Sequence, residues 1–329
     1  MPFWSKGKDA GSGHRRLRIL FVTDLHGSEL TFRKLLSSLK VWSPDVFIAG
    51  GDVAGKGLLP VLDSGNGTVR VRWMGEERDV ARDQYQEIAT NAAQLGFYPY
   101  LADAAELETL RADPAASESI FEGLMQERWR NWLERLDRRC AELTVPAFVI
   151  AGNDDPWSLD DASREPREWV QAADGLVLPL AEDWTLMSCG LANQTPWQCP
   201  RDVSEEDLAA HLESLAEQID DFSNVIANIH VPPYKSSLDI APQLDTSVFP
   251  PRAIAGATAP VGSHAVADFI EQRAPLLSLH GHIHESPGAV RLGRTWAINP
   301  GSEYAEGILR GVLVTVERDR VVGHQFVTG

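Results

Sequence analysis

Short apolar runs that end abruptly in polar or glycine-rich residues recur along the chain. "LRILFVTDLHG" (17–27) opens with apolar and β-branched residues and becomes polar at Thr23 and Asp24. "DVFIAGGDVAGKG" (45–57) and "VPAFVIAGNDD" (145–155) follow the same plan. A short apolar run bounded by turn residues predicts a buried strand that ends in a loop. Further strands are predicted over 184–190, 224–230, 275–280, 294–298 and 311–316.

Segments with apolar residues at helical spacing lie between these strands. They predict helices over 30–40, 204–220 and 263–273. Strands that alternate with helices are typical of an α/β layered fold. We therefore expect one domain over 17–329, preceded by a flexible polar leader over 1–16.

Two regions depart from this alternation. Residues 58–143 contain a hairpin pattern around Gly65–Gly67 and a long amphipathic helix pattern over 117–143. We expect this stretch to be a largely helical insertion or cap that packs beside the functional site. Residues 231–262 are rich in Pro, Gly and Ser, and they predict a long loop.

Composition narrows the class of protein. The formal charge of −17 disfavours a protein that grips extended nucleic acid, because such proteins neutralise phosphates with many Lys and Arg side chains. No apolar run approaches the roughly 20 residues of a membrane span, and the start lacks the apolar core of a secretory signal. Three cysteines without a C-x-x-C pattern suit reduced thiols, so the expected location is cytoplasmic. A homo-oligomer is left open.

Polar side chains that bind metals follow five of the predicted strands. Ligands of open α/β sheets bind at the carboxyl ends of strands. In extended chain, residues at i and i+2 point to the same side, so we expect each D-x-H or H-x-H pair to face one centre. The residues are Asp24 and His26 after the first strand, Asp52 after the second, Asn153 after the third, His230 after "NVIANIH", and His282 and His284 after "LLSLHG".

These residue types suit metal coordination. Imidazole and carboxylate groups bind Mn, Fe, Zn, Co or Ni, and the absence of thiolates argues against a structural zinc site. Seven ligands are too many for one ion and fit two divalent ions if one carboxylate bridges them. Asp52, which follows Gly50 and Gly51, is the expected bridge. Two divalent ions would outweigh the charge of two carboxylates, so the pocket would attract a phosphate ester despite the acidic chain.

The ordered blocks "DLH", "GGDV", "GND", "NIHVPP" and "GHIH" resemble the calcineurin-like metallophosphoesterase superfamily. "GGDVAGKGLLP", "LANQTPWQCPRD" and "HGHIHE" are most similar to bacterial and archaeal Icc-related phosphoesterases. The resemblance implies a two-sheet α/β sandwich flanked by helices, and hydrolysis of phosphomonoesters or phosphodiesters by a metal-bound hydroxide. It assigns one metal to Asp24, His26, Asp52 and His284, and the second to Asp52, Asn153, His230 and His282.

One position departs from the pattern of that superfamily. The usual Gly-Asn-His followed by an acid places a histidine near the leaving group, whereas this chain has Asp154 followed by Asp155. A free aspartate has a pKa of about 3.9, and nearby cations lower it, so Asp154 would have no proton to give at neutral pH. Asp154 and Asp155 are nevertheless the candidate catalytic residues at this place.

The expected activity is that of a binuclear metal-dependent phosphoesterase, with a phosphodiesterase favoured. A phosphomonoesterase, a nuclease, or a non-catalytic metal-binding scaffold are the alternatives. The expected partner is a small phosphate ester, with nucleotides included. Trp157 and Trp197 could stack on a nucleobase or aryl group, although such residues more often pack loops. Arg201 could bind a phosphate oxygen, and a salt bridge is at least as common for an arginine in such a place.

Overall fold

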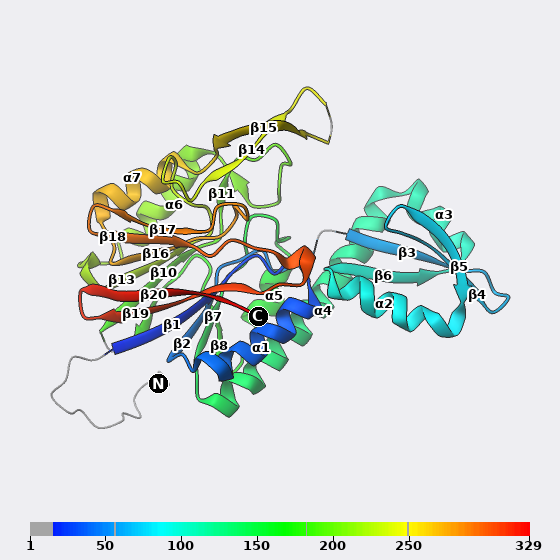
Figure 1. Ribbon diagram of the computed structural model, residues 1–329, viewed down its shortest axis with the longest axis horizontal. Coiled ribbons are helices and arrows are strands. Elements are labelled where there is room, and N and C mark those ends of the chain that lie inside the picture. The colour runs from blue at the N-terminus through cyan, green and yellow to red at the C-terminus, as the bar shows by residue number, and fades with distance from the viewer. Residues whose placement is uncertain (1–15, 56, 182, 249) are drawn as a thin grey trace.

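The computed structural model describes residues 16–55, 57–181, 183–248 and 250–329, and two six-stranded sheets form its centre (Figure 1). The first sheet has the order β20-β19-β1-β2-β7-β8, and the second has the order β17-β18-β16-β13-β10-β9. The strands of the first sheet are β1 (Arg16–Val22), β2 (Val46–Ala49), β7 (Ala147–Val149), β8 (Val170–Ala172), β19 (Arg310–Glu317) and β20 (Arg320–Thr328). Those of the second are β9 (Val177–Ala181), β10 (Trp184–Cys189), β13 (Val225–Ile229), β16 (Leu277–Leu279), β17 (Gly288–Leu292) and β18 (Thr295–Asn299).

Each sheet is built on a block of parallel strands. β1, β2, β7 and β8 run parallel in the first sheet, and β10, β13, β16 and β18 run parallel in the second. The register pairs Phe21 with Ile48 and Ile48 with Phe148. Because parallel strands in register end at the same edge, the loops that follow β1, β2 and β7 meet, and the loops after β13 and β16 do the same.

Alternating side chains divide the apolar residues of each strand between two layers. Ile19 and Phe21 of β1 pack between the sheets against residues such as Leu186 and Ile226, whereas Leu20 faces the helices. Helices cover the outer face of each sheet, so the predicted sandwich flanked by helices is confirmed. They are α1 (Glu29–Trp42), α4 (Pro114–Leu143) and α5 (Leu159–Arg164) on the first sheet, and α6 (Glu205–Ala216) and α7 (His264–Arg273) on the second.

The insertion divides into a projecting lobe, which we define as residues 57–112, and the long helix α4, which packs on the sandwich (Figure 1). The predicted hairpin is present, with Gly65 and Gly67 at φ 70° and 84° in its turn. The lobe holds more strand than the sequence predicted, because a four-stranded sheet accompanies its helices. Its elements are β3 (Gly57–Asp63), β4 (Thr68–Trp73), β5 (Glu76–Ala81), the turn η2 (Arg82–Gln84), α2 (Tyr85–Gln94), β6 (Phe97–Ala102) and α3 (Ala104–Ala112).

The lobe contacts the loop that follows β1. Arg128 of α4 donates hydrogen bonds to the carbonyls of Gly27 and Phe97, each at 2.8 Å, and so joins this loop to the lobe. Gly96 adopts φ 91°, and a Cβ there would lie 2.2 Å from the carbonyl oxygen of His26. Only glycine allows this approach, so the lobe lies directly beside the loop that carries His26.

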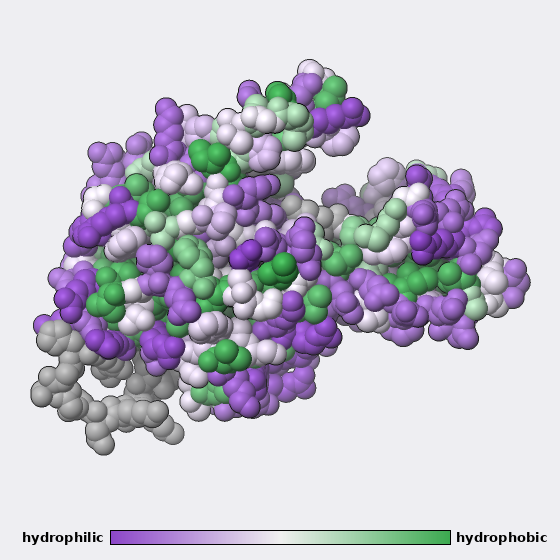
Figure 2. Space-filling view, viewed as in Figure 1, coloured by the Kyte–Doolittle hydropathy of each residue, from purple (hydrophilic) through white to green (hydrophobic). Residues whose placement is uncertain are grey.

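Of two expectations for loops, one lies almost wholly outside the described residues and the other is corrected. Residues 1–15 of the predicted leader lie outside the described residues, and Arg16 already belongs to β1. The predicted long loop over 231–262 instead contains an antiparallel hairpin, β14 (Ile240–Asp245) and β15 (Arg252–Pro260). Its strands contain proline and glycine, which a two-stranded ribbon outside the main sheets tolerates. Figure 2 shows the hairpin and the lobe as two projections, with the surface hollowed between them.

The remaining short elements are β11 (Ala192–Asn193), β12 (Asp202–Val203), η3 (Phe222–Asn224) and η4 (Tyr304–Glu306). No helix within the described ranges combines the length and apolar character needed to cross a membrane.

A buried aromatic pair fixes α4 on α1 and can be tested by mutation. Trp132 is 1% exposed, stacks on Phe32 with ring centroids 4.3 Å apart, and donates through Nε1 to Glu29 at 2.6 Å. We expect Trp132→Ala to lower the free energy of unfolding by about 3–5 kcal/mol, measured by urea denaturation. Trp197→Ala is the control, because Trp197 is 55% exposed and its loss should cost no more than about 0.5 kcal/mol. Equal losses in the two variants would contradict this packing.

Candidate metal centre

The seven residues predicted as metal ligands converge at the carboxyl ends of five strands from both sheets. They follow β1, β2 and β7 of the first sheet and β13 and β16 of the second. Five of them are buried and two are partly exposed. The buried residues are Asp24, His26, Asp52, Asn153 and His230, and the partly exposed ones are His282 and His284.

The backbone of these loops is not extended. Asp24, His26, Asp52 and His282 have φ angles of 54°, 40°, 51° and 66°, in the left-handed region that is costly for residues other than glycine. Hydrogen bonds hold the first two loops together: Asp24 N–H donates to Gly51 O at 3.0 Å, and His26 N–H donates to Asp52 O at 2.9 Å. Strain of this kind persists where the surroundings over-determine it, as they do at functional sites.

A first group of donor atoms forms around Asp24, His26 and His284. The Nε2 atoms of His26 and His284 lie 3.1 Å apart. Oδ1 of Asp24 lies 3.3 Å from Nε2 of His284 and 3.9 Å from Nε2 of His26. Oδ2 of Asp52 completes the group at 3.6 Å from Nε2 of His26.

A second group contains Asp52, His230 and His282, with Asn153 beside them. Oδ1 of Asp52 lies 3.4 Å from Nε2 of His230, and Oδ1 of Asn153 lies 2.8 Å from Nδ1 of His282. The two oxygens of Asp52 thus face different groups, as a bridging carboxylate requires. His282 and His284 lie in different groups of the one centre, and the left-handed backbone at His282 breaks the i, i+2 alternation that extended chain would give.

The distances between these atoms fit metal coordination. Ligands that each lie about 2.1 Å from one cation are separated by roughly 3.0–3.4 Å in octahedral or tetrahedral geometry. Nδ1 of His230 lies 2.7 Å from Gly50 O and donates to it, so Nε2 is the nitrogen that faces the centre. Nε2 is buried and lies 3.4 Å from the Asp52 carboxylate. A cation between the two groups would take the place of a proton on Nε2, so the donor set fits two divalent ions.

The electrostatics of the metal-free chain agree with this geometry. Burial lowers the pKa of His230, but the negative charge of Asp52 outweighs it and raises that pKa to about 10. Burial lowers the pKa of His282 to about 4, so this ring is neutral and able to ligate. The chain therefore holds a proton beside Asp52 where a cation would bind, and metal binding would release it.

Close approach of two loops requires glycine at this centre. Gly51 has φ 102°, and a Cβ there would lie 2.7 Å from the backbone of Gly152. A Cβ at Gly152 would lie 2.2 Å from Oδ1 of Asp52. Any side chain at either position would push the loops after β2 and β7 apart.

Asp154 lies at the centre, in the position where the resemblance expected a histidine. Its side chain is 27% exposed, and its Oδ2 lies 3.7 Å from Nδ1 of His26. Its Oδ1 lies 3.6 Å from the Cys199 thiol, and its backbone N–H donates to Asp52 at 3.0 Å. Asp154 can thus act on the charge of the centre and on a bound ligand.

Asp155 lies behind the centre and joins two loops. Its fully buried carboxylate accepts hydrogen bonds from the N–H groups of Val53, Ala54 and Gly152 at 3.0, 2.8 and 2.8 Å. Burial raises its pKa to about 7, and the three N–H donors oppose that rise. The geometry makes Asp155 a positioning residue, and a catalytic role for it stays a prediction.

Arg201 is completely buried, and its guanidinium is engaged by the chain. It donates to the carbonyls of Asp155 and Pro156 at 2.9 and 3.1 Å and pairs with Asp160 and Asp174 at 2.6 and 3.2 Å. These bonds anchor the loop after β7. A phosphate contact by Arg201 therefore stays a prediction for which the structure offers no support.

The two tryptophans named as substrate contacts lie on the surface. Trp157 is 55% exposed, stacks over the Arg201 guanidinium at 4.3 Å, and donates to Pro200 O at 3.0 Å. Trp197 is also 55% exposed. More than half of each residue's surface is exposed, and contact of either side chain with a substrate stays a prediction.

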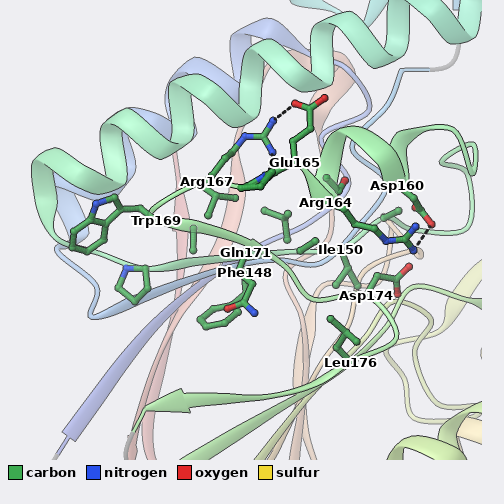
Figure 3. Close-up of a pocket in the computed structure, with 18 of the residues that line it drawn as sticks. Phe148, Ile150, Asp160, Arg164, Glu165, Arg167, Trp169, Gln171, Asp174 and Leu176 are labelled. Atoms are coloured by element: carbon green, nitrogen blue, oxygen red, sulfur yellow. Dashed lines mark hydrogen bonds and ion pairs between the residues drawn. The ribbon is translucent and has the colours of Figure 1, made fainter. Parts of the chain in front are cut away.

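A pocket of about 460 Å³ lies at the β8 edge of the first sheet (Figure 3). Asp160 and Asp174 line it, and Arg164 pairs with Asp160 at 3.2 Å. None of the seven clustered residues is among its described lining residues. The pocket is therefore separate from the candidate metal centre. Asp160 and Asp174, which line it, also pair with Arg201 and so help to anchor the loop after β7.

Three residues near the centre were not predicted from the sequence. The ring of Tyr304 lies 4.6 Å from that of His26, and Ser302 Oγ donates to Asp24 O at 2.7 Å. The signal for both was "AINPGSEY", an apolar run that ends in polar and glycine residues like the other blocks. Asp202 accepts a hydrogen bond from the Asn153 side chain at 2.9 Å; it ends the block "LANQTPWQCPRD", but nothing in that block assigned it a role.

Solved structures of other proteins are similar to this chain in fold. A crystal structure 15% identical to the chain matches with a TM-score of 0.54, covering 96% of this chain and 99% of that one. The protein TT1561 of Thermus thermophilus, 13% identical, matches with a TM-score of 0.50, covering 92% of this chain and 100% of that one. The chain therefore has the same overall fold as these two structures. Identities this low establish the fold and no activity.

Sequence comparison finds similarity over only part of the chain. The uncharacterized protein MJ1162 of Methanocaldococcus jannaschii is 27% identical over 121 residues, which cover 36% of this chain and 49% of that protein. The match thus spans about half the length of that relative. No family model matches the chain. A structure described as a novel archaeal phosphodiesterase, 9% identical, covers 95% of this chain and 100% of that one, but its TM-score of 0.39 supports no argument.

The bridging position of Asp52 predicts how metal content responds to mutation. We expect protein reconstituted with Mn²⁺ to hold about two ions per chain by elemental analysis, and Asp52→Asn to hold one or none, because a neutral amide bridges two cations poorly. Asp319→Asn, at an exposed turn, is the matched control and should keep both ions. One ion or none in the unmutated protein would exclude the binuclear site.

Proposed function

We propose that the chain is a binuclear metal-dependent phosphoesterase that acts on phosphodiesters. The observation that supports this is the position of Asp52, whose two oxygens face the two groups of donor atoms. Two divalent ions held there would lower the pKa of a bound water toward neutrality and polarise the oxygens of a phosphoryl group.

The side chains of the chain set the charge of this site. Asp24 and Asp52 contribute two negative charges, whereas Asn153 and the four histidines can ligate as neutral groups. Two divalent cations would leave the centre positive, so it would attract an anionic ester although the chain carries −17. His280 supports the centre, because its buried Nδ1 donates to the carbonyls on either side of His230 at 2.8 and 3.0 Å.

Asp154 supports a diester rather than a monoester as substrate. Its carboxylate lies at the centre and reduces the positive charge there. A phosphomonoester is mostly a dianion at neutral pH, whereas a phosphodiester carries one charge, so repulsion by Asp154 costs more for the monoester. The substrate class that we propose is a small phosphodiester, nucleotides included, with the exposed rings of Trp157 and Trp197 as stacking surfaces for an aromatic group.

The alternatives differ in what they require of the site. A phosphomonoesterase would have to bind a dianion beside Asp154, and a nuclease would have to hold a polyanion against an acidic chain. A non-catalytic scaffold would bind metal without turnover. Metal content alone does not separate a scaffold from an enzyme, so turnover must be measured with and without metal.

The test of the proposed function is a metal-dependent hydrolysis screen. We expect protein reconstituted with Mn²⁺ to hydrolyse an activated aryl phosphodiester and to lose that activity on chelation, with slower hydrolysis of the matched aryl phosphomonoester. Cyclic nucleotides and linear dinucleotides extend the screen. A protein that holds two ions and turns over none of these esters would support the scaffold instead.

Asp154 predicts a strong dependence of rate on the leaving group. Because Asp154 is an anion beside cations, it has no proton to give, and esters of acidic phenols should react well while alkyl esters react slowly. The comparison is Asp154→Ala against the unmutated protein over phosphodiesters of rising leaving-group pKa, with metal content checked. We expect both to fall off with the same slope. A steeper fall in Asp154→Ala would show that Asp154 is a general acid and that this interpretation is wrong.

A further inference from the structure

The side-chain amide of Asn153 is held in one orientation by Asp202. Nδ2 of Asn153 donates to Oδ1 of Asp202 at 2.9 Å. An ionised carboxylate only accepts hydrogen bonds, so it selects the NH₂ end of the amide. The amide oxygen must then face the other way, where it lies 2.8 Å from Nδ1 of His282 in the second group.

We propose that Asp202 is the positioning residue that aims the Asn153 oxygen at the second metal position and strengthens that oxygen as a ligand. A hydrogen bond from the NH₂ group to a carboxylate polarises the amide and places more negative charge on its oxygen. Partners behind a ligand commonly orient it and tune its affinity for metal. This inference rests on the binuclear site of the proposed function.

The carboxylate of Asp202 is itself fixed. Its Oδ2 accepts hydrogen bonds from the Thr195 N–H at 2.9 Å, the Thr195 hydroxyl at 2.5 Å and the Cys199 N–H at 3.0 Å. Three donors on one oxygen leave Oδ1 directed at Asn153. Asp202 can therefore impose an orientation on Asn153 rather than adapt to it.

The segment 195–202 also holds the backbone of the loop after β7. Arg201 N–H donates to the carbonyl of Asn153 at 3.1 Å, and the Arg201 guanidinium bonds Asp155 O at 2.9 Å. Asn153 is thus held at its backbone and at its side chain by neighbouring residues of one segment. Asn153 and Asp202 lie 49 positions apart in the sequence, so their contact depends on the tertiary fold.

This arrangement explains why an amide suits the ligand position. An aspartate at 153 would add a negative charge directly to the centre and would face the Asp202 carboxylate. Asn153 supplies a neutral oxygen, while the charge of Asp202 stays one hydrogen bond away. The centre keeps more positive charge for an anionic substrate, and the ligand still gains from a nearby anion.

The opposing interpretation is that Asp202 only closes the turn 195–202. Exchanging the amide and the carboxylate between positions 153 and 202 distinguishes the two interpretations. In Asp202→Asn, the oxygen stays with the three donors of the turn, so an NH₂ group faces the NH₂ group of Asn153. Asn153 must then rotate and turn its NH₂ group toward the metal. In Asn153→Asp, two carboxylates face each other. The double variant restores one donor and one acceptor, with a carboxylate oxygen toward the metal.

The experiment is a Mn²⁺ titration of metal-free protein, followed by electron paramagnetic resonance of free Mn²⁺, on four proteins: unmutated, Asp202→Asn, Asn153→Asp and the double variant. We expect Asp202→Asn to weaken one of two Mn²⁺ affinities about 10–100-fold and the double variant to recover most of that loss. Thr195→Val, which removes one donor to Oδ2 and leaves Oδ1 in place, is the control for the turn and should stay within about threefold. Thermal unfolding checks that each variant is folded.

Each outcome decides between the interpretations. The proposal is overturned if Asp202→Asn binds Mn²⁺ as tightly as the unmutated protein. It is also overturned if the double variant binds Mn²⁺ no more tightly than the weaker-binding of the two single variants. Equal weakening by Thr195→Val and Asp202→Asn, without rescue in the double variant, assigns Asp202 to the turn alone. If the unmutated protein binds no second ion, the proposed function fails together with this inference, and that result is distinguishable because it involves no variant.

Discussion

A buried carboxylate shared between two sets of donor atoms is the constraint on which the structure depends. Asp52 is 3% exposed, with one oxygen toward His26 and the other toward His230. A buried charge is costly unless cations or hydrogen bonds compensate it. The two sheets must therefore bring their strand ends together at this point, and Gly51 and Gly152 allow the loops to approach closely enough.

The layers of the fold could be predicted because they follow from local pattern. The strands that carry metal-binding residues are short apolar runs next to polar ones, and the structure places them within a few residues of the predicted ranges. The hairpin over 240–260 and the strands β5 and β6 of the lobe were missed, because Pro, Gly and charged residues weaken the alternation that marks a strand. Such ribbons depend on pairing with a neighbour, which single-sequence pattern does not contain.

The residues of the candidate metal centre could be predicted from the sequence, but their geometry could not. The seven residues were recognised because each follows a strand, and the family resemblance divided His282 and His284 between two metals, but the alternation of extended chain does not separate them. The left-handed conformations at Asp24, His26, Asp52 and His282 are imposed by contacts between loops, so no sequence rule reveals them. The role of Asp202 was not predicted for a similar reason: this residue follows no long apolar run, and its partner Asn153 is distant in the sequence.

The surroundings of Asp154 favour a charged rather than a protonated carboxylate. Burial, together with the neighbouring Asp154 charge, raises the pKa of the Cys199 thiol to about 12, so the thiol keeps its proton. A protonated thiol at 3.6 Å is a donor to Asp154 and supports its negative charge. His26 lies on the other side of the carboxylate and would be held by a metal through Nε2. Where the resemblance expects a proton donor, this chain therefore places an anion stabilised from two sides. Under the proposed function, such a centre would select substrates by charge and would depend on the ester itself, or on the metals, to stabilise the departing oxygen.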